Sequence, residues 1–259
     1  MNEKKILAVD YDNTLKQGDR VSGRNRKAAA EFQKAGNILV LDTGRNYMDA
    51  VAAAEECGIP FDYICALAGN LLFDGKCRTF IAETHARMHD FPDITETITK
   101  IKPLFIRRYY RKDGIFLRLG NDKYEEESEW FSGCSIEKFN DDFLPFSLMT
   151  CRFESPAAAL QAANELGKLY QNGLIYSHES FIDVLPKNGG KAFGLKKLAS
   201  RIGVPKENIY AIGDSFADLQ MITEFHGYFV DTAPESLIKQ SDGSYTDVAS
   251  LIEDILTLF

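Results

Sequence analysis

Short apolar runs alternate with amphipathic segments in the first part of the chain. The spacing predicts strands at 6–9, 37–41 and 62–67, with helices at 24–36 and 46–58 between them. Strands that are joined through helices run parallel, so this order is typical of a single parallel sheet. The first part of the chain therefore predicts an α/β fold.

The same alternation returns in the last part of the chain. A helix is predicted over 191–203, a strand over 207–214 and a further helix over 215–225. The two ends share one pattern and are predicted to form two halves of one domain, with boundaries at 1–82 and 183–259.

The segment between them, 83–182, is dominated by strand-like runs and predicts an inserted α+β domain. Its clearest feature is 105–120, where Asp113-Gly114 is a favoured two-residue hairpin turn. That turn pairs Lys112 with Ile115 across the hairpin. The residues that then share one face are Arg107, Tyr109, Arg111, Phe116 and Arg118.

Composition and charge narrow the class of protein. The 259 residues are 45% hydrophobic and 26% charged, which is ordinary for a globular protein, and the formal net charge is −8. This charge disfavours nucleic acid and anionic membranes as partners, and no apolar run approaches the ~18 residues of a membrane span. We expect a cytoplasmic monomer or homodimer that acts on a small molecule.

The cysteines suggest neither disulfides nor zinc. They are odd in number and form no CxxC pair, so free thiols are expected. The five positions are Cys57, Cys65, Cys77, Cys134 and Cys151.

Polar side chains follow the predicted strands at the points where these end. Ligands of parallel sheets bind outside the carboxyl ends of the strands, so these residues are predicted to meet at one edge. In addition, Lys191 opens a helix directly after two glycines. The strand-end residues are Asp10, Asp12, Asp42, Thr43, Gly44, Arg45, Asp214 and Ser215.

This set of groups suits phosphoryl transfer. A carboxylate at about 4 Å from a phosphate dianion meets a repulsion of about 8 kcal/mol at an effective dielectric near 20. Magnesium held by two or three oxygens, together with one lysine, would offset that repulsion. An EF-hand calcium loop is excluded, because Leu15 and Val21 stand where it requires glycine and glutamate. A plain turn remains an alternative for DYDNT alone.

Taken together, four motifs resemble those of haloacid dehalogenase-like phosphohydrolases. They are DYDNT (10–14), LDTGR (41–45), Lys191 and GDSFAD (213–218). The insertion between the second and third motifs resembles the branch with a large α/β cap, as in Cof-type sugar phosphatases and eukaryotic phosphomannomutases. The resemblance implies a Rossmann-like core with an inserted cap at 83–182.

The resemblance also implies roles for individual residues. Asp10 would be the nucleophile that forms an aspartyl-phosphate, and Asp12 would protonate the leaving oxygen and then activate water. Thr43 and Gly44 would hold the phosphoryl group, with Arg45 binding substrate beside them, and Lys191 would bridge nucleophile and phosphate. Mg²⁺ would be bound by Asp10, the backbone carbonyl of Asp12 and Asp214, with Asp218 supporting.

The chain departs from the family pattern at several positions. Asn13 stands where glycine is frequent, and asparagine tolerates positive φ. Ala217 replaces an asparagine near the metal, and Asp231 adds a negative charge where asparagine is frequent. Ala68-Gly69-Asn70 stands where the family often shows asparagine-glycine-alanine.

The leading hypothesis is a magnesium-dependent phosphatase of a small phosphorylated metabolite, in particular a sugar phosphate. The arginine face of Arg107, Arg111 and Arg118 is expected to meet the leaving group. Two alternatives remain open. One is a phosphomutase of the same fold, and the other is a phospholigand-binding regulator that has lost turnover.

Overall fold

The chain folds into two compact units. The computed structural model describes residues 3–87, 97–98, 100–101, 103–109, 115–117, 135–136, 145–170 and 173–257. One unit comprises Met1–Ala82 and Gly190–Phe259, and the other comprises Glu83–Gly189. The boundary expected at 183 falls inside strand β15 (Phe181–Leu185), which pairs with strands on both sides within the second unit. The second unit therefore includes all of β15 and extends to Gly189.

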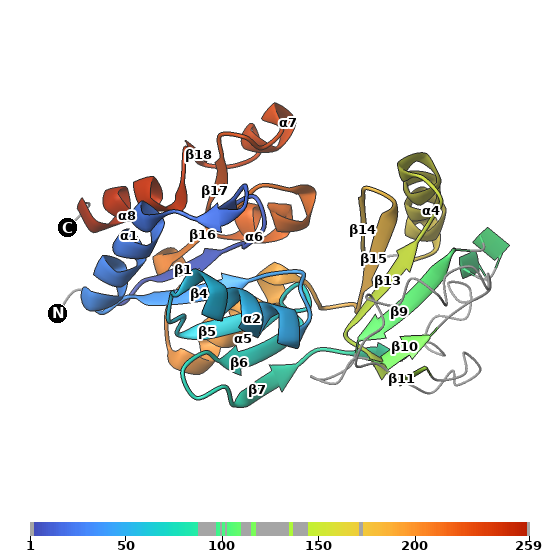
Figure 1. Ribbon diagram of the computed structural model, residues 1–259, viewed down its shortest axis with the longest axis horizontal. Coiled ribbons are helices and arrows are strands. Elements are labelled where there is room, and N and C mark those ends of the chain that lie inside the picture. Colours follow the sequence, from blue (N-terminus) through green and yellow to red (C-terminus); the bar gives the residue numbers. More distant parts are fainter. Residues whose placement is uncertain are drawn as a thin grey trace. The chain divides into compact units, whose positions relative to one another are not determined.

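The first unit is built on an eight-stranded sheet in the order β18-β17-β16-β1-β4-β5-β6-β7 (Figure 1). The first six strands in that order pair in parallel, and β6 is antiparallel to β5. The parallel sheet predicted from the alternation is therefore present. The strand bounds are β1 Ile6–Val9, β4 Ile38–Asp42, β5 Tyr63–Ala66, β6 Leu71–Asp74, β7 Phe80–Glu83, β16 Ile209–Gly213, β17 His226–Val230 and β18 Gly243–Tyr245.

Helices flank this sheet, and a small hairpin of β2 (Lys16–Gln17) and β3 (Arg20–Val21) follows β1. Alternate residues of β1 point to opposite faces of the sheet, and Ile6 and Ala8 join the core that contains α5 and α6. On α1, Ser22 is the N-cap residue, and its side chain accepts the N–H of Asn25. The helix bounds are α1 Gly23–Lys34, α2 Tyr47–Cys57, α5 Lys191–Ile202, α6 Leu219–Glu224, α7 Glu235–Ile238 and α8 Val248–Thr257.

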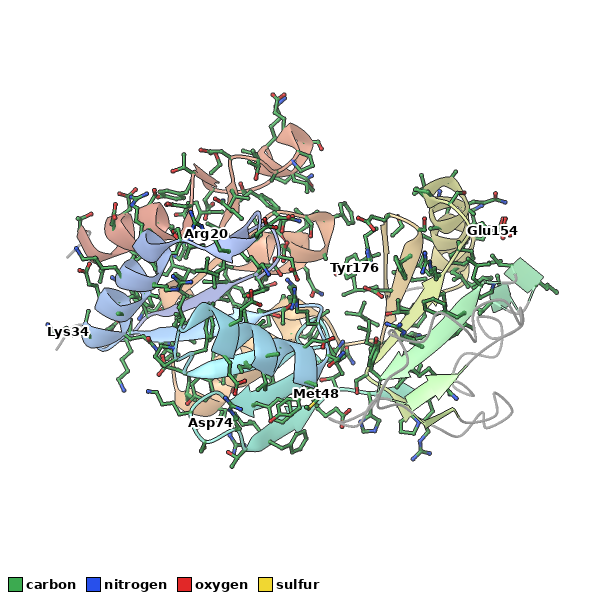
Figure 2. All side chains as sticks on the ribbon, in the orientation of Figure 1. Arg20, Lys34, Met48, Asp74, Glu154 and Tyr176 are labelled. Carbon is green, nitrogen blue, oxygen red and sulfur yellow. The ribbon has the colours of Figure 1, made fainter. Side chains whose placement is uncertain are left out.

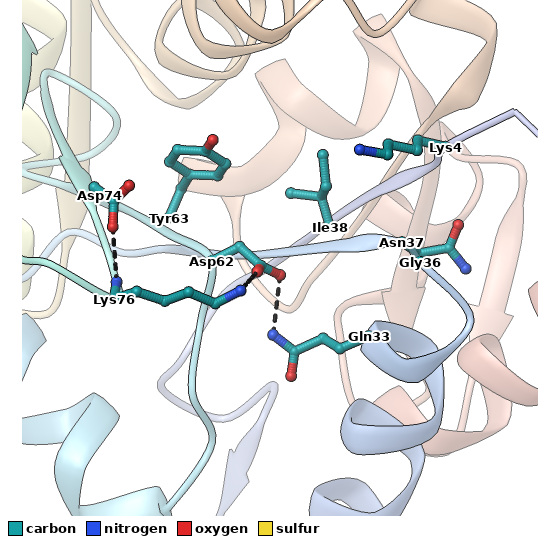
Figure 3. A pocket seen from close by; sticks show the side chains of 9 residues that line it. All are labelled: Lys4, Gln33, Gly36, Asn37, Ile38, Asp62, Tyr63, Asp74 and Lys76. Carbon is teal, nitrogen blue, oxygen red and sulfur yellow. Dashed lines mark hydrogen bonds and ion pairs between the residues drawn. The ribbon is translucent and has the colours of Figure 1, made fainter.

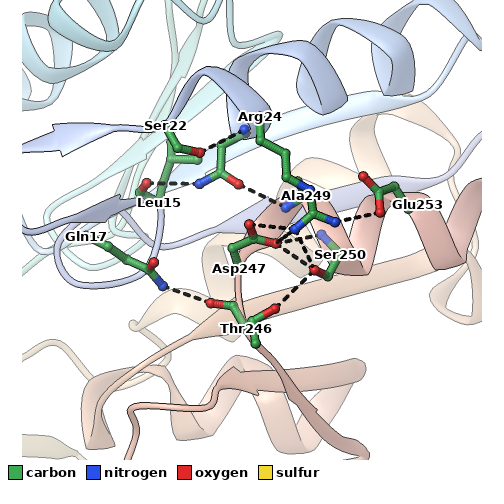
Figure 4. Close-up of polar contacts among 10 residues, drawn as sticks. Leu15, Gln17, Ser22, Arg24, Thr246, Asp247, Ala249, Ser250 and Glu253 are labelled. Carbon is green, nitrogen blue, oxygen red and sulfur yellow. Dashed lines mark hydrogen bonds and ion pairs between the residues drawn. The ribbon is translucent and has the colours of Figure 1, made fainter.

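A polar network ties α1 to α8 (Figure 4). The buried Asn25 donates through Nδ2 to the carbonyl of Leu15 and accepts the N–H of Ala249. On the surface beside it, Arg24 donates to Asp247 and Glu253. The C-terminal helix is thereby fixed to the helix that follows the first strand.

The second unit contains a six-stranded sheet in the order β11-β10-β9-β13-β15-β14. Helix α4 (Pro156–Leu169) packs on one face of it, over a core that includes Ile106, Met149 and Ile182. A separate two-stranded pair joins β8 (Ala86–Arg87) to β12 (Pro145–Phe146). The remaining strand bounds are β9 Phe105–Tyr109, β10 Ile115–Leu117, β11 Ser135–Ile136, β13 Leu148–Arg152 and β14 Leu174–His178.

The predicted pairing of the β9–β10 hairpin is wrong. Ile115 pairs with Arg108 and not with Lys112, so the connection is longer than a two-residue turn. The register differs from the predicted one by four residues. Because four is an even number, the side chains remain on the same faces of the hairpin as predicted. Periodicity alone cannot distinguish registers related in this way. On its other side β9 pairs with β13, where Arg108 lies opposite Met149. The Asp113-Gly114 turn itself lies outside the described residues.

Two further observations concern the chain as a whole. The four cysteines in the described part of the chain, Cys57, Cys65, Cys77 and Cys151, are free thiols. None of the helices in that part combines the length and the apolar character that a membrane crossing requires.

Candidate active site

Three acidic side chains meet at the carboxyl edge of the first unit's sheet. Asp10 directly follows β1, and Asp214 directly follows β16, the neighbouring strand. Asp218, four residues later, is the N-cap residue that directly precedes α6. One carboxylate oxygen from each of the three lies within 4.8 Å of the others. The sheet therefore brings together residues more than 200 positions apart in sequence.

Lys191, the first residue of α5, lies between two of these carboxylates. Its Nζ donates to Asp10 Oδ1 at 2.6 Å and to Asp218 Oδ1 at 2.5 Å, and the residue is only 2% exposed. Burial by itself would lower the pKa of Lys191, but the charges of Asp10 and Asp218 more than offset burial, so the pKa is raised. The lysine is thus held as a cation beside Asp10.

The loop after β16 is organised around the second carboxylate oxygen of Asp218. This oxygen accepts the backbone N–H of Asp214 and of Ser215, both at 3.1 Å, and the Ser215 hydroxyl at 3.0 Å. With Lys191 on its other oxygen, Asp218 has hydrogen bonds on both sides. It therefore fixes the backbone that carries Asp214.

Thr14 orients Asp214 from the other loop. Its hydroxyl donates to Asp214 Oδ1 at 3.0 Å, and the threonine is fully buried. Thr14 was not among the predicted site residues. Its position in DYDNT, two residues after Asp12, could have indicated a role in the site. Asn13 has φ of 58°, so the position does require the left-handed region that was expected for it.

Asp12 is paired with Arg45. The guanidinium donates to both carboxylate oxygens of Asp12, at 2.8 and 2.7 Å, and lies 4.7 Å from the ring centroid of Tyr11. Side-chain exposure is 52% for Asp12 and 31% for Arg45, so the pair faces solvent. The structure therefore places Arg45 where it orients Asp12.

Thr43 and Gly44 follow β4, the neighbour of β1 on the other side. Thr43 is buried, and its hydroxyl oxygen accepts the N–H of Arg45 at 3.2 Å, while Gly44 is exposed. These two residues stand at the same edge of the sheet as Asp10.

Asp42, the last residue of β4, is a further acid that the sequence placed at this edge without a specific role. It is fully buried, and neither carboxylate oxygen has a hydrogen-bond partner. Burial raises its pKa to about 8, against the opposing charge of Lys191. A neutral carboxylic acid is therefore the dominant form at neutral pH.

The acidic group is suited to a divalent cation. The group holds three carboxylates and one lysine, which is bonded to Asp10 and Asp218. Burial raises the pKa of Asp10 well above its ordinary value, with Lys191 opposing and the other two acids adding to it. Burial and then Asp218 also raise the pKa of Asp214. Crowded carboxylate oxygens with an excess of negative charge are the donors that Mg²⁺ prefers. The residues present fit such an ion.

Two departures from the family pattern are placed by the structure. Asp231 is exposed after β17 and accepts the Ser244 hydroxyl at 2.5 Å, and it is not part of the acidic group. Asn70 is buried and accepts the N–H of Gly190 at 3.0 Å. Asn70 therefore contacts the segment that carries Lys191.

The second unit presents a polar face opposite α4. Arg107 of β9, Thr150 of β13, Asp183 of β15 and Tyr176 of β14 lie in one cross-strand row, and Tyr176 is labelled in Figure 2. Thr150 donates to Asp183 at 2.5 Å, and Arg107 donates to Tyr109 at 3.3 Å. We call this surface, which faces away from α4, the open face of the second sheet, although Arg107 and Tyr176 on it are only 9% and 8% exposed. Arg111 and Arg118, which were expected beside Arg107, lie outside the described residues.

A pocket of about 430 Å³ lies at the opposite edge of the first unit's sheet (Figure 3). It is lined by Ile38 and Tyr63, where β4 and β5 begin, and several of its polar groups pair with one another. Asp62 forms an ion pair with Lys76 at 2.7 Å and accepts Gln33 at 2.9 Å. These contacts stabilise the amino ends of the strands and leave the carboxyl edge as the candidate active site.

Comparisons with known proteins agree with this geometry. The profile of one family, haloacid dehalogenase-like hydrolase, matches residues 7–249. The 5-amino-6-(5-phospho-D-ribitylamino)uracil phosphatase YwtE of Bacillus subtilis is 25% identical over 240 residues, which cover 84% of each protein. Phosphatase YwpJ of the same organism is 23% identical over 251 residues, covering 84% of this chain and 86% of YwpJ.

Solved structures share the fold. A haloacid dehalogenase-like hydrolase from Bacteroides thetaiotaomicron superposes with a TM-score of 0.73 at 24% identity, over 98% of this chain and 100% of the other. A subclass IIB sugar phosphatase of the same superfamily gives a TM-score of 0.79 at 14% identity, over 97% and 99% of the two chains. Both likenesses extend over the core and the inserted unit.

Proposed function

This chain belongs to the haloacid dehalogenase-like hydrolases, and on that premise we propose that it is a magnesium-dependent phosphatase of a small phosphorylated metabolite. The observation that carries the proposal is Lys191, buried between Asp10 and Asp218 at hydrogen-bond distance from both. A nucleophilic carboxylate needs a fixed cation beside it to approach a phosphate dianion.

The proposed reaction has two steps. In the first, a carboxylate oxygen of Asp10 forms a bond to phosphorus, the bond to the leaving oxygen breaks, and Asp12 donates a proton to that oxygen. In the second, Asp12 removes a proton from water, the water oxygen attacks the phosphorus of the aspartyl-phosphate, and Asp10 is released with inorganic phosphate. Arg45 orients the Asp12 side chain in both steps and takes no part in the bond changes.

The remaining groups stabilise charge. Lys191 remains cationic and offsets the charge of the phosphoryl oxygens, and Thr43 and Gly44 are proposed to bind those oxygens. Asp10 and Asp214, supported by Asp218, are the residues that would hold Mg²⁺, with the backbone carbonyl of Asp12 as a further ligand. The ion would supply additional positive charge to the transferring phosphoryl group.

A sugar phosphate is the proposed substrate. Polar and aromatic side chains alternate on the open face, with Arg107 beside the ring of Phe105 at 5.0 Å and Thr150 bonded to Asp183. Such a surface suits a polyhydroxylated leaving group, because it offers donors, acceptors and flat apolar rings together. The sugar phosphatase among the structural neighbours and the ribitylamino-uracil phosphatase among the relatives support this class.

The test is a phosphate-release screen with Mg²⁺ over sugar phosphates, nucleotides and phosphorylated acids. Asp10→Asn should abolish turnover and leave the circular dichroism spectrum unchanged, and retained turnover would refute the nucleophile. Measuring isomer formation beside free phosphate separates the phosphatase from a phosphomutase. Ligand binding without turnover by the wild-type protein on every substrate would favour the regulator.

A further inference from the structure

Helix α5, which begins with Lys191, has no capping side chain at its N-terminus. The N-cap residue is Gly190, at φ of 103°, and it has no side chain to accept the first backbone N–H groups. Unpaired N–H groups at a buried helix start are unfavourable, and their acceptors must come from elsewhere.

Two side chains from distant segments supply those acceptors. Asn70 Oδ1 accepts the N–H of Gly190 at 3.0 Å, and Gln220 Oε1 accepts the N–H of Ala192 at 3.3 Å. The two bonds flank Lys191 in sequence, one on the residue before it and one on the residue after it. The backbone of Lys191 is therefore fixed on both sides by groups outside its own helix.

The segment that precedes Asn70 has an unusual backbone conformation that brings it against the start of α5. Leu67, Ala68 and Gly69 have φ of 52°, 53° and 82°, three consecutive residues in the left-handed region. A Cβ on Gly69 would lie 2.7 Å from the carbonyl oxygen of Gly190 and equally close to the Cα of Lys191. The backbone of Gly69 thus packs directly against the backbone at the start of α5. The hydrogen bond from Gly190 to Asn70 stabilises that contact.

The segment that carries Gln220 also carries the carboxylate that binds Lys191. Asp218 accepts the Lys191 ammonium, and two residues later Gln220 accepts the amide after Lys191. The Nζ of Lys191 and the backbone next to it are therefore both hydrogen-bonded to residues 218–220, around the start of α6.

From this arrangement we infer that Asn70 and Gln220 are positioning residues for Lys191, which set the distance of its Nζ from Asp10. The inference deepens the proposed function and rests on it for the catalytic consequence alone. Each is bonded to the backbone on one side of Lys191, and both are inferred to act through the backbone of residues 190–192.

The experiment measures the freedom of Lys191 directly. Formaldehyde with dimethylamine–borane methylates accessible lysines, and peptide mass spectrometry gives the rate for Lys191. The buried Lys5 serves as an internal reference for global opening. In Asn70→Ala, Lys191 should be methylated about tenfold faster than in the wild type, the factor expected from losing one buried hydrogen bond, with Lys5 unchanged. Ser22→Ala removes a matched cap bond from α1 and should leave Lys191 unchanged.

Turnover gives the second readout. Asn70→Ala and Gln220→Ala should each lower kcat about tenfold with KM changed less than about threefold, and Asn70→Asp, which keeps an acceptor oxygen, should recover part of the loss. Unchanged methylation of Lys191 in both alanine variants, or faster methylation with unchanged kcat, would overturn the inference. If the wild-type protein releases no phosphate, the proposed function fails, while methylation still decides whether the two side chains hold Lys191.

Discussion

The buried acid at the end of β4 gives the sharpest prediction about this molecule. Asp42 is fully buried with no hydrogen-bond partner on either oxygen, and its pKa is raised from an ordinary 3.8 to about 8. Asn has nearly the same shape and remains neutral at every pH. Asp42→Asn therefore isolates the effect of ionisation from the effect of packing.

The sign follows from proton binding. In the unfolded chain Asp42 releases its proton above pH 3.8, while in the folded protein it keeps the proton up to about pH 8. The folded state binds the extra proton, so the free energy of unfolding of the wild type falls as pH rises through that interval, by about 1.4 kcal/mol per pH unit. The accumulated loss is about 4 kcal/mol at pH 7 and about 5 kcal/mol at pH 8.

Asp42→Asn removes this loss and should be the more stable protein at neutral pH. The advantage over the wild type should grow from about 2 kcal/mol at pH 5 to about 5 kcal/mol at pH 8, apart from a constant offset for the buried amide. Urea unfolding followed by circular dichroism at pH 5, 6, 7 and 8 measures it. Other titrating groups affect both proteins and cancel in the difference.

A second neutral substitution provides the control. Asp42→Ser leaves a smaller side chain and a cavity, so its offset differs, but it should show the same dependence on pH relative to the wild type. Parallel pH curves for the wild type and both variants would refute the reasoning, since they would mean that Asp42 is ionised in the folded protein.

Four further predictions concern the site, the metal, the open face and the fold. Thr14→Val removes the bond to Asp214 and should raise the Mg²⁺ concentration for half-maximal activity about tenfold or more, whereas an unchanged magnesium titration would contradict this role. Chelation with EDTA should abolish phosphate release and added Mg²⁺ should restore it; activity that survives exhaustive chelation argues against the ion. Arg107→Ala should lower kcat/KM about tenfold for the preferred sugar phosphate and leave a simple aryl phosphate unaffected, and equal losses on both substrates would remove the open face from recognition. Asn25→Ala breaks two buried bonds between α1, Leu15 and α8 and should lower the free energy of unfolding by about 2 kcal/mol in urea titrations, with Asn25→Asp, which keeps the acceptor for Ala249, losing less.

The elements and the main acids of the site could be predicted because their causes are local. Strands β1, β4 and β16 are continuous apolar runs, and each ends at a polar residue that sits at the carboxyl edge. Parallel strands place those ends together whatever the helices between them contain. Asp10 and Asp214 were therefore predictable neighbours from periodicity and chain order.

Other features of the site could not be predicted from the sequence. Nothing near Asn70 in sequence indicates that its side chain caps a helix 120 residues later, and Gln220 reads as an ordinary helical residue. Arg45 reads as a group for substrate, but in the fold it is bonded to Asp12. The burial of Asp42 without a partner likewise depends on what packs over the end of β4.

The sequence by itself determined the alternation of strands and helices around β1, β4, β5 and β16 and the polar residues that end or follow β1, β4 and β16. Only the tertiary structure decided the register of β9 with β10, the extent of the second unit to Gly189 and the fixing of Lys191 between two distant segments. The physical reason is the difference in the sequence range over which these interactions act. Periodicity and turn chemistry act over a few residues, whereas registers, caps from distant side chains and pKa values are set by groups that meet only when the chain is packed.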